Sequence, residues 1–191
     1  MNPTDRGQEV GRIMAMRSAD AGTTWSELGS VPIYPGTQYA NYHEPHVVEL
    51  ENGNLVGHIR VKNYDDAHVA DRGIVSFSIM QSESTDGGKS WAEMRPLGFH
   101  GSPPHLIRHS SGTLICAYGY RKEPYGQRVA LSDDDGKTWE HDRILRNDGP
   151  NSDLGYPCSV ELSDGSIFTV YYQQLDAESK CGLLYSRWKL P

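Results

Sequence analysis

One eight-residue pattern, present three times, constrains the fold of this chain more than any other feature. The pattern is Ser-x-Asp-x-Gly-x-Thr/Ser-Trp, and it occurs at residues 18–25, 84–91 and 132–139. Its aspartate can accept hydrogen bonds from turn amides, its glycine can adopt positive φ, and its tryptophan can cover apolar surface beside the turn. Such recurrence indicates a structural repeat, so we interpret each copy, here called a box, as a tight connection between two strands. The residues that define the boxes are Asp20, Gly22, Trp25, Asp86, Gly88, Trp91, Asp134, Gly136 and Trp139.

The acidic run 133–135 in the third box suggests a calcium loop as an alternative. An EF-hand loop places a glycine at its sixth position and a glutamate at its twelfth. Counted from Asp133, these positions hold Thr138 and Ile144. We therefore reject the calcium interpretation, predict no metal site and assign the boxes a structural role.

A second repeat, between the boxes, predicts β-hairpins. The segments 44–60, 103–119 and 156–172 align without gaps, and each carries a proline near its start and a glycine in its polar turn. A short apolar run precedes the turn, and a run rich in β-branched and aromatic residues follows it, as in a hairpin. Further runs predict third and fourth strands around the boxes, at 74–82, 93–98, 127–132 and 141–146.

Units of four short antiparallel strands in series are typical of a β-propeller. The chain provides a half blade (10–30), two whole blades (44–98 and 103–146) and a terminal partial blade (157–189), all within one domain at 1–191. Propellers need roughly four to eight blades to close. We therefore expect either the C-terminal part of a longer chain or a homodimer whose two copies complete the propeller.

Composition excludes several functions. The net charge of −7 disfavours a nucleic acid partner. The sequence has no apolar segment of signal-peptide or membrane-span length, so we expect no membrane partner and, for a complete chain, a cytoplasmic location. No phosphate loop is present, and no cofactor is predicted. Cys116, Cys158 and Cys181 lack CxxC spacing, so we expect small buried thiols rather than a disulfide framework or a zinc site.

Positions that differ between the repeats are candidates for ligand contact, because scaffold positions look alike in every blade. Glu44 and Tyr156 stand just before two of the aligned prolines. The first strand of each propeller blade lies innermost, so both side chains should face the same central funnel. His46 and His105 follow the prolines, and Arg60 has no basic counterpart in the other two segments.

These segments resemble the sialidase (neuraminidase) superfamily, whose Asp-box repeats the three boxes match along nearly the whole chain. The stretch HEPHVVELENGNLVGHIR is similar to the segment in which a glutamate precedes a strand and an arginine ends the hairpin. The stretch GYPCSVELSDGSIFTVYY resembles the last-blade segment with a nucleophilic tyrosine. The resemblance implies an all-β, six-bladed, sialidase-like β-propeller, of which this chain supplies about three blades. It further implies that Tyr156 is the nucleophile, that Glu44 polarises it, and that Arg60 is one of three substrate-binding arginines.

The resemblance does not choose between Arg121 and Arg128 as a second arginine of the site. The family's N-terminal arginine motif and its aspartate acid/base have no match in this sequence, so we expect the chain alone to lack part of the catalytic machinery. The implied function is that of a glycoside hydrolase of the exo-α-sialidase type acting on terminal acidic sugars, with His46 and His105 as further candidate substrate contacts.

The residue types suit that chemistry. A sialic acid carries a carboxylate at its anomeric carbon and would repel a carboxylate nucleophile, whereas a tyrosine stays neutral until a glutamate takes its proton. Arginine binds a carboxylate through two parallel hydrogen bonds. Two alternatives remain: a hydrolase or lyase for uronic-acid polysaccharides that uses the same arginines, and a non-catalytic glycan-binding propeller.

Overall fold

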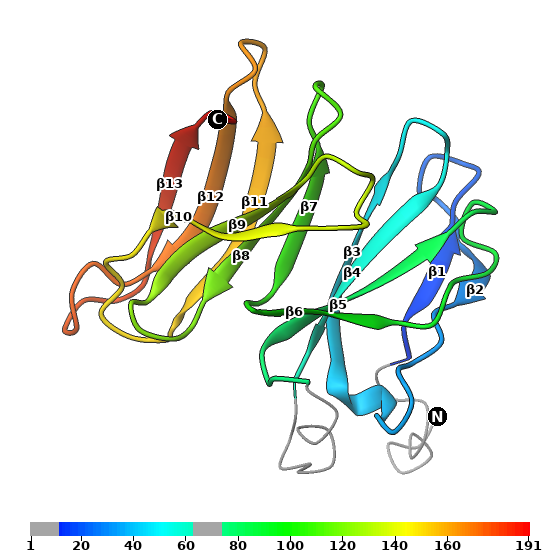
Figure 1. Ribbon diagram of the computed structural model, residues 1–191, viewed down its shortest axis with the longest axis horizontal. Coiled ribbons are helices and arrows are strands. Elements are labelled where there is room, and N and C mark those ends of the chain that lie inside the picture. The colour runs from blue at the N-terminus through cyan, green and yellow to red at the C-terminus, as the bar shows by residue number, and fades with distance from the viewer. Residues whose placement is uncertain (1–11, 63–73) are drawn as a thin grey trace.

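The computed structural model describes residues 12–62 and 74–191, which form four antiparallel sheets and a short 3-10 turn at Tyr39–Asn41 (Figure 1). Residues 10–11 of the expected half blade and 63–73 of the first expected whole blade lie outside the described residues. Within the described ranges no helix is long and apolar enough to cross a membrane. The all-β prediction is therefore confirmed for this part of the chain.

Each sheet is built from strands that follow one another in sequence. The first has two strands, β1 (Met14–Arg17) and β2 (Ser26–Ser30). The second has four, β3 (Tyr42–Glu49), β4 (Leu55–Val61), β5 (Ser78–Ser84) and β6 (Arg95–His100). The third also has four, β7 (Pro104–Arg108), β8 (Leu114–Tyr120), β9 (Gly126–Ser132) and β10 (Glu140–Arg146). The last has three, β11 (Leu154–Glu161), β12 (Ile167–Gln173) and β13 (Gly182–Trp188).

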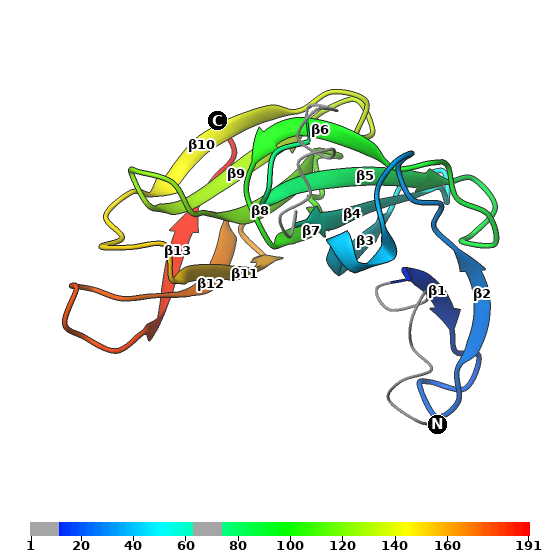
Figure 2. The same ribbon diagram turned by 90° about the horizontal axis from the view of Figure 1, so that it is seen from below.

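The sheets follow an arc, with the first and last sheets at its two ends (Figure 2). Strand β7 packs against both β3 and β11, so the first strands of the last three sheets lie in the order β3, β7, β11. An apolar cluster lies between each pair of neighbouring sheets, as in consecutive propeller blades. These clusters are centred on Ile59 and Met80, on Leu106 and Leu114, and on Ile115.

Histidines at one repeat position connect the first strands. His46 Nδ1 on β3 accepts the backbone N–H of Leu106 on β7 at 3.1 Å, and His105 Nδ1 on β7 accepts that of Ser159 on β11 at 3.2 Å. Burial lowers the pKa of both rings, that of His105 to about 4, so both are neutral at pH 7 and can accept a hydrogen bond. A histidine at the same repeat position therefore bridges each of two successive sheet interfaces.

The three boxes share one hydrogen-bond pattern. In the third, the Ser132 hydroxyl donates to Asp134 Oδ1 at 2.8 Å and accepts the Gly136 N–H at 2.9 Å. Asp134 also accepts the backbone N–H and the hydroxyl of Thr138, at 2.9 and 2.6 Å. The corresponding atoms of the other two boxes make the same bonds. These hydrogen bonds lower the pKa of each box aspartate to about 2, and the bond from the Thr or Ser hydroxyl before the tryptophan has the largest effect. Each carboxylate is therefore charged at neutral pH.

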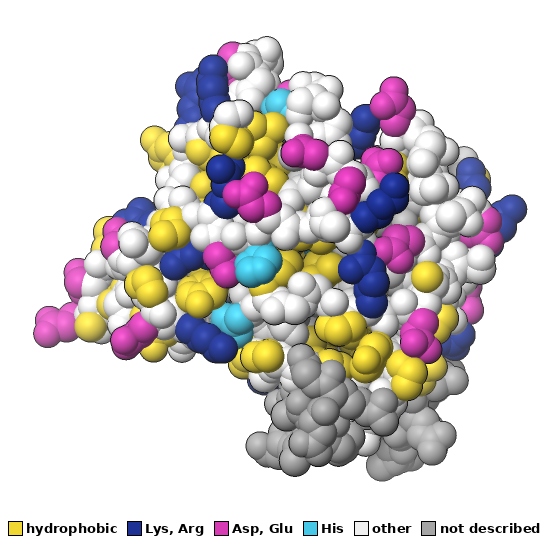
Figure 3. All heavy atoms as spheres, in the orientation of Figure 1, with side chains coloured by type: hydrophobic (Ala, Val, Ile, Leu, Met, Phe, Trp, Pro, Cys, Tyr) yellow, Lys and Arg dark blue, Asp and Glu magenta, His cyan; other side chains and the backbone are white. Residues whose placement is uncertain are grey.

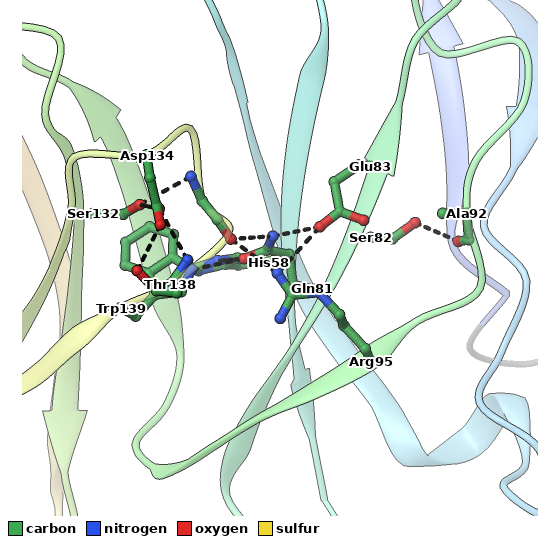
Figure 4. Close-up of polar contacts among 11 residues, drawn as sticks. His58, Gln81, Ser82, Glu83, Ala92, Arg95, Ser132, Asp134, Thr138 and Trp139 are labelled. Atoms are coloured by element: carbon green, nitrogen blue, oxygen red, sulfur yellow. Dashed lines mark hydrogen bonds and ion pairs between the residues drawn. The ribbon is translucent and has the colours of Figure 1, made fainter.

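The third box also fastens two sheets together through a buried glutamine (Figure 4). Trp139 Nε1 donates to Gln81 Oε1 of β5 at 2.8 Å, and His58 Nε2 lies 3.0 Å from the same oxygen. Gln81 Nε2 donates in turn to the carbonyl of Gly136 at 2.8 Å. Gln81 and His58 are fully buried, so these bonds satisfy polar groups that cannot reach solvent. The indole of Trp91, by contrast, donates to Gly88 within its own box.

Two expectations about side-chain burial are wrong. Cys116 is buried, but Cys158 and Cys181 are exposed, and all three are free thiols. Trp91 and Trp139 pack on apolar clusters, whereas Trp25 is 61% exposed. The reason is position: Trp25 belongs to the first sheet and the exposed cysteines to the last, and among the described residues no further sheet lies beyond either end.

The open end of the last sheet carries exposed apolar side chains, among them Val160, Leu183 and Tyr185. Over the described part of the face in Figure 3, Lys and Arg side chains are interspersed with Asp and Glu.

The inter-sheet role of Trp139 predicts a difference between two matched variants. Trp139→Phe removes a donor to buried Gln81 in the neighbouring sheet, and Trp91→Phe removes a donor within its own box. We expect Trp139→Phe to lower the unfolding free energy by about 1 kcal/mol more than Trp91→Phe, the usual net contribution of a buried hydrogen bond. Urea unfolding followed by circular dichroism measures both, and equal losses would contradict the inter-sheet role.

Candidate active site

Two β-bulges aim the candidate side chains of the innermost strands. The pairing of β3 with β4 shifts register between His43 and His46, and that of β11 with β12 shifts between Gly155 and Cys158. Glu44 and Tyr156 lie within these bulges, with φ of 50° and 51°. A bulge redirects a side chain out of the strand's regular alternation, and positive φ is strained for residues of this size. Strand β7, between them, pairs regularly with β8.

The two bulge side chains meet across β7. Tyr156 Oη donates a hydrogen bond to Glu44 Oε1 at 2.5 Å, although the two residues belong to different sheets. Arg60 on β4 donates through Nη1 to both carboxylate oxygens of Glu44, at 2.9 and 2.7 Å. Arg60 is 9% exposed and Tyr156 is 50% exposed. The glutamate is thus held by a buried cation, and the tyrosine ring remains open to a ligand.

The electrostatics of the pair keep the proton on the tyrosine. Burial raises the pKa of Glu44, but the hydrogen bonds from Tyr156 and Arg60 and the charge of Arg60 outweigh it, so the pKa lies below the ordinary value. The bond to the Glu44 carboxylate, together with burial, raises the pKa of Tyr156. At neutral pH the free site therefore holds a glutamate anion and a neutral tyrosine, the state in which Glu44 can act as a base.

Of the two arginines between which the sequence does not choose, Arg121 lies near Arg60 and therefore on the side of the Tyr156–Glu44 pair. Its guanidinium is 5.9 Å from the Phe77 ring centroid, and that of Arg60 is 4.8 Å from the same ring. Arg121 Nη1 donates to the carbonyl of Ser152 at 3.0 Å, in the segment that leads to β11. The two guanidinium groups are therefore neighbours on one aromatic ring.

Arg128 is engaged elsewhere. It is 4% exposed, and its guanidinium donates to the backbone carbonyls of Pro124, Gln127 and Arg146. It also lies 4.6 Å over the Tyr120 ring. These bonds occupy Arg128 on the β9–β10 side of its sheet, so the geometry favours Arg121 as the second arginine of the site.

His46 and His105 lie between the first strands, with their ring centroids 4.3 Å apart. Their Nδ1 atoms are used in the backbone bonds that join the sheets. These contacts make them supports for the strands that carry Glu44 and Tyr156. A role for either histidine in substrate binding stays a prediction. Within the described residues, no group of three or more His, Cys, Asp or Glu converges as a metal site would require.

Sequence reasoning missed Phe77 and Lys62. Phe77 precedes β5 with φ of 60°, and Lys62 Nζ lies 5.5 Å from its ring centroid. The one available signal was the spacing of Lys62 two residues after Arg60, since alternate residues of a strand share a face. No sequence pattern predicts positive φ at a phenylalanine.

Comparison with known proteins identifies the family. The chain matches the family model of the BNR repeat-like domain over residues 1–171. A sialidase from Micromonospora viridifaciens is 26% identical over 138 residues, which cover 59% of this chain and 21% of the sialidase.

Two solved structures share the fold. A protein of unknown function from Dyadobacter fermentans superposes with a TM-score of 0.77 and 26% identity, covering 92% of this chain and 45% of that one. A mutant of NanB sialidase from Streptococcus pneumoniae gives a TM-score of 0.66 and 21% identity, covering 94% of this chain and 28% of that one.

The chain thus spans less than half the length of each of these proteins. The likeness to a sialidase structure confirms the predicted sialidase-like β-propeller, of which the described sheets are a part. Because the family model covers most of its length, the chain belongs to the family of BNR repeat-like domains, within the sialidase-like superfamily.

Proposed function

We propose that this chain carries the nucleophile half of a glycoside hydrolase active site of the exo-α-sialidase type, acting on a terminal acidic sugar. The observation that supports it is the 2.5 Å hydrogen bond from Tyr156 to Glu44, made by two strained bulge residues of different sheets. Strain at two residues that meet, beside two arginines, is typical of a functional site rather than of a scaffold.

In the first step, Tyr156 Oη forms a bond to the anomeric carbon while the bond to the leaving oxygen breaks. The tyrosine proton passes along the existing hydrogen bond to Glu44. Water then attacks the anomeric carbon of the tyrosyl glycoside, and Glu44 returns its proton to Tyr156 as the tyrosine leaves. The leaving group takes a proton from an acid that has no match in this sequence, and the same group, once deprotonated, accepts the proton that water loses in the second step.

The charges at the site favour an anionic substrate. Arg121 has a backbone carbonyl as its hydrogen-bond partner, and among the described residues no carboxylate pairs with it. Arg60 donates to both carboxylate oxygens of Glu44. A substrate carboxylate that draws Arg60 away from Glu44 would raise the pKa of Glu44 and strengthen it as a base. Binding of the acidic sugar would then itself promote proton transfer.

Two tyrosines with neighbouring rings provide a matched test of the nucleophile. The Tyr156 and Tyr172 ring centroids are 5.9 Å apart, but Tyr172 donates its hydroxyl to Asp153 instead of Glu44. An aryl α-sialoside is a suitable substrate, because its phenolate leaves without help from an acid. We expect Tyr156→Phe to lower kcat at least about 10²-fold and Tyr172→Phe to keep kcat within a few-fold of wild type.

The same assay separates the alternatives. An aryl β-glucuronide and a neutral aryl α-L-arabinofuranoside serve as comparison substrates, and both should react more slowly than the sialoside. An unsaturated product that absorbs in the ultraviolet, formed from a uronic-acid polymer, would indicate a lyase. Absence of turnover with every activated substrate would refute the hydrolase and leave a glycan-binding propeller.

The role of Glu44 as a base predicts a pH dependence. Its pKa is lowered in the folded protein, so the charged base, and with it kcat/KM, persists below pH 4.5 and is lost as the pH falls further. Arg60→Gln removes the charge and disrupts the two hydrogen bonds that lower this pKa, so the acid limb should move to higher pH. Arg121→Gln is the control, since Arg121 makes no bond to Glu44. An unmoved limb in Arg60→Gln would contradict the assignment of Glu44.

A further inference from the structure

The backbone of Phe77 is clamped by both neighbouring strands. Its N–H donates to the carbonyl of Val61 at the end of β4, at 3.0 Å. Its carbonyl accepts the N–H of Gly101, just after β6, at 2.7 Å. Its φ of 60°, a value rarely adopted by aromatic residues, sets the direction in which the side chain leaves the backbone. Strain at such a residue is retained only where the surrounding structure enforces it.

Three cations converge on this one ring. The guanidinium carbons of Arg60 and Arg121 lie 4.8 and 5.9 Å from its centroid, and the Lys62 ammonium lies at 5.5 Å. All three distances fall within the roughly 6 Å range of a cation–π contact. Arg60 and Lys62 come from β4 and from the residue directly after it, whereas Arg121 follows β8 of the next sheet. The ring therefore joins cations from two blades.

Hydrogen bonds hold the two guanidinium groups separately, each to its own partner. In the described part of the chain, Arg60 is held by Glu44 and Arg121 by Ser152, each through Nη1. The Nε atoms of both arginines are buried without a hydrogen-bond partner there. The aromatic ring is thus the contact that both groups share, and its electron-rich face offsets part of the repulsion between them.

We propose that Phe77 is a positioning residue that holds Arg60, Lys62 and Arg121 as one cationic wall and thereby selects sugars that carry a carboxylate. This inference rests on the proposed function for the site's sugar ligand. Phe77 acts through the cations and takes no part in the proton transfer between Tyr156 and Glu44. Loss of the ring should therefore weaken the binding of the carboxylate. The two bonds from Arg60 to Glu44 do not involve the ring, so the acid limb set by Glu44 should stay in place.

The test compares a variant without the ring with one that keeps it. Phe77→Leu removes the π face at similar volume, and Phe77→Tyr retains it. Calorimetry measures binding of N-acetylneuraminic acid and of its methyl ester, which lacks the charge, to the whole chain. We expect wild type to prefer the acid, Phe77→Leu to reduce that preference about tenfold, and Phe77→Tyr to restore most of it.

A second variant keeps the test valid if Phe77→Leu does not fold, as thermal unfolding would reveal. Lys62→Gln should weaken binding of the acid several-fold and leave binding of the ester unchanged. The kcat/KM profile of a folded Phe77 variant should retain its acid limb, which a general distortion of the site would move.

The outcomes distinguish this inference from the proposed function. If the acid is preferred through Phe77 but no substrate turns over, the cationic wall stands and the hydrolase fails. If turnover depends on Tyr156 but Phe77→Leu keeps the full preference for the acid, the role of Phe77 is refuted alone. Equal binding of acid and ester by wild type would also overturn it.

Discussion

The candidate site depends on how the first strands of neighbouring sheets are held together. Glu44 on β3 and Tyr156 on β11 are far apart in sequence and belong to different sheets. Their contact therefore depends on how β3 and β11 pack on either side of β7. His46 connects β3 to β7, and His105 connects β7 to β11, each by accepting a backbone N–H at its Nδ1. Burial lowers the pKa of both rings and keeps them neutral, so that they can accept these bonds. A change in the spacing of these three strands would break the 2.5 Å hydrogen bond between Tyr156 and Glu44, even if each sheet folded correctly.

The box turns and the contacts between sheets support the strained residues of the inner strands. The boxes close their turns with charged, fully bonded aspartates, and Trp139 extends the third box to buried Gln81 in the sheet before it. The cost of holding Glu44 and Tyr156 at positive φ is of the order of 1–3 kcal/mol each, which needs a surrounding structure that does not yield. Buried polar contacts and apolar clusters between the sheets provide that support.

Local patterns made most of the fold predictable. The boxes and the hairpins follow from residues close together in sequence, and the alignment of repeats isolated Glu44, Tyr156 and Arg60 because the strands around them are alike. The choice between Arg121 and Arg128 was not accessible, since both occupy one short segment and differ only in which partners the folded chain offers them. Phe77 was missed because its importance comes from a backbone conformation set by two neighbouring strands. The exposure of Cys158 and Cys181 depends on what covers the last sheet, which thiol spacing does not encode.

The proposed function requires that Tyr156 is a nucleophile activated by Glu44 across a blade. Covalent trapping with a 2,3-difluorinated sialic acid tests it directly, since the anomeric fluoride leaves without an acid and the second fluorine slows hydrolysis of the intermediate. Peptide mapping by mass spectrometry then locates the sugar. We expect one sugar on the peptide that contains Tyr156 and none after Tyr156→Phe. A sugar attached to Glu44, or unmodified protein after prolonged exposure, would contradict it.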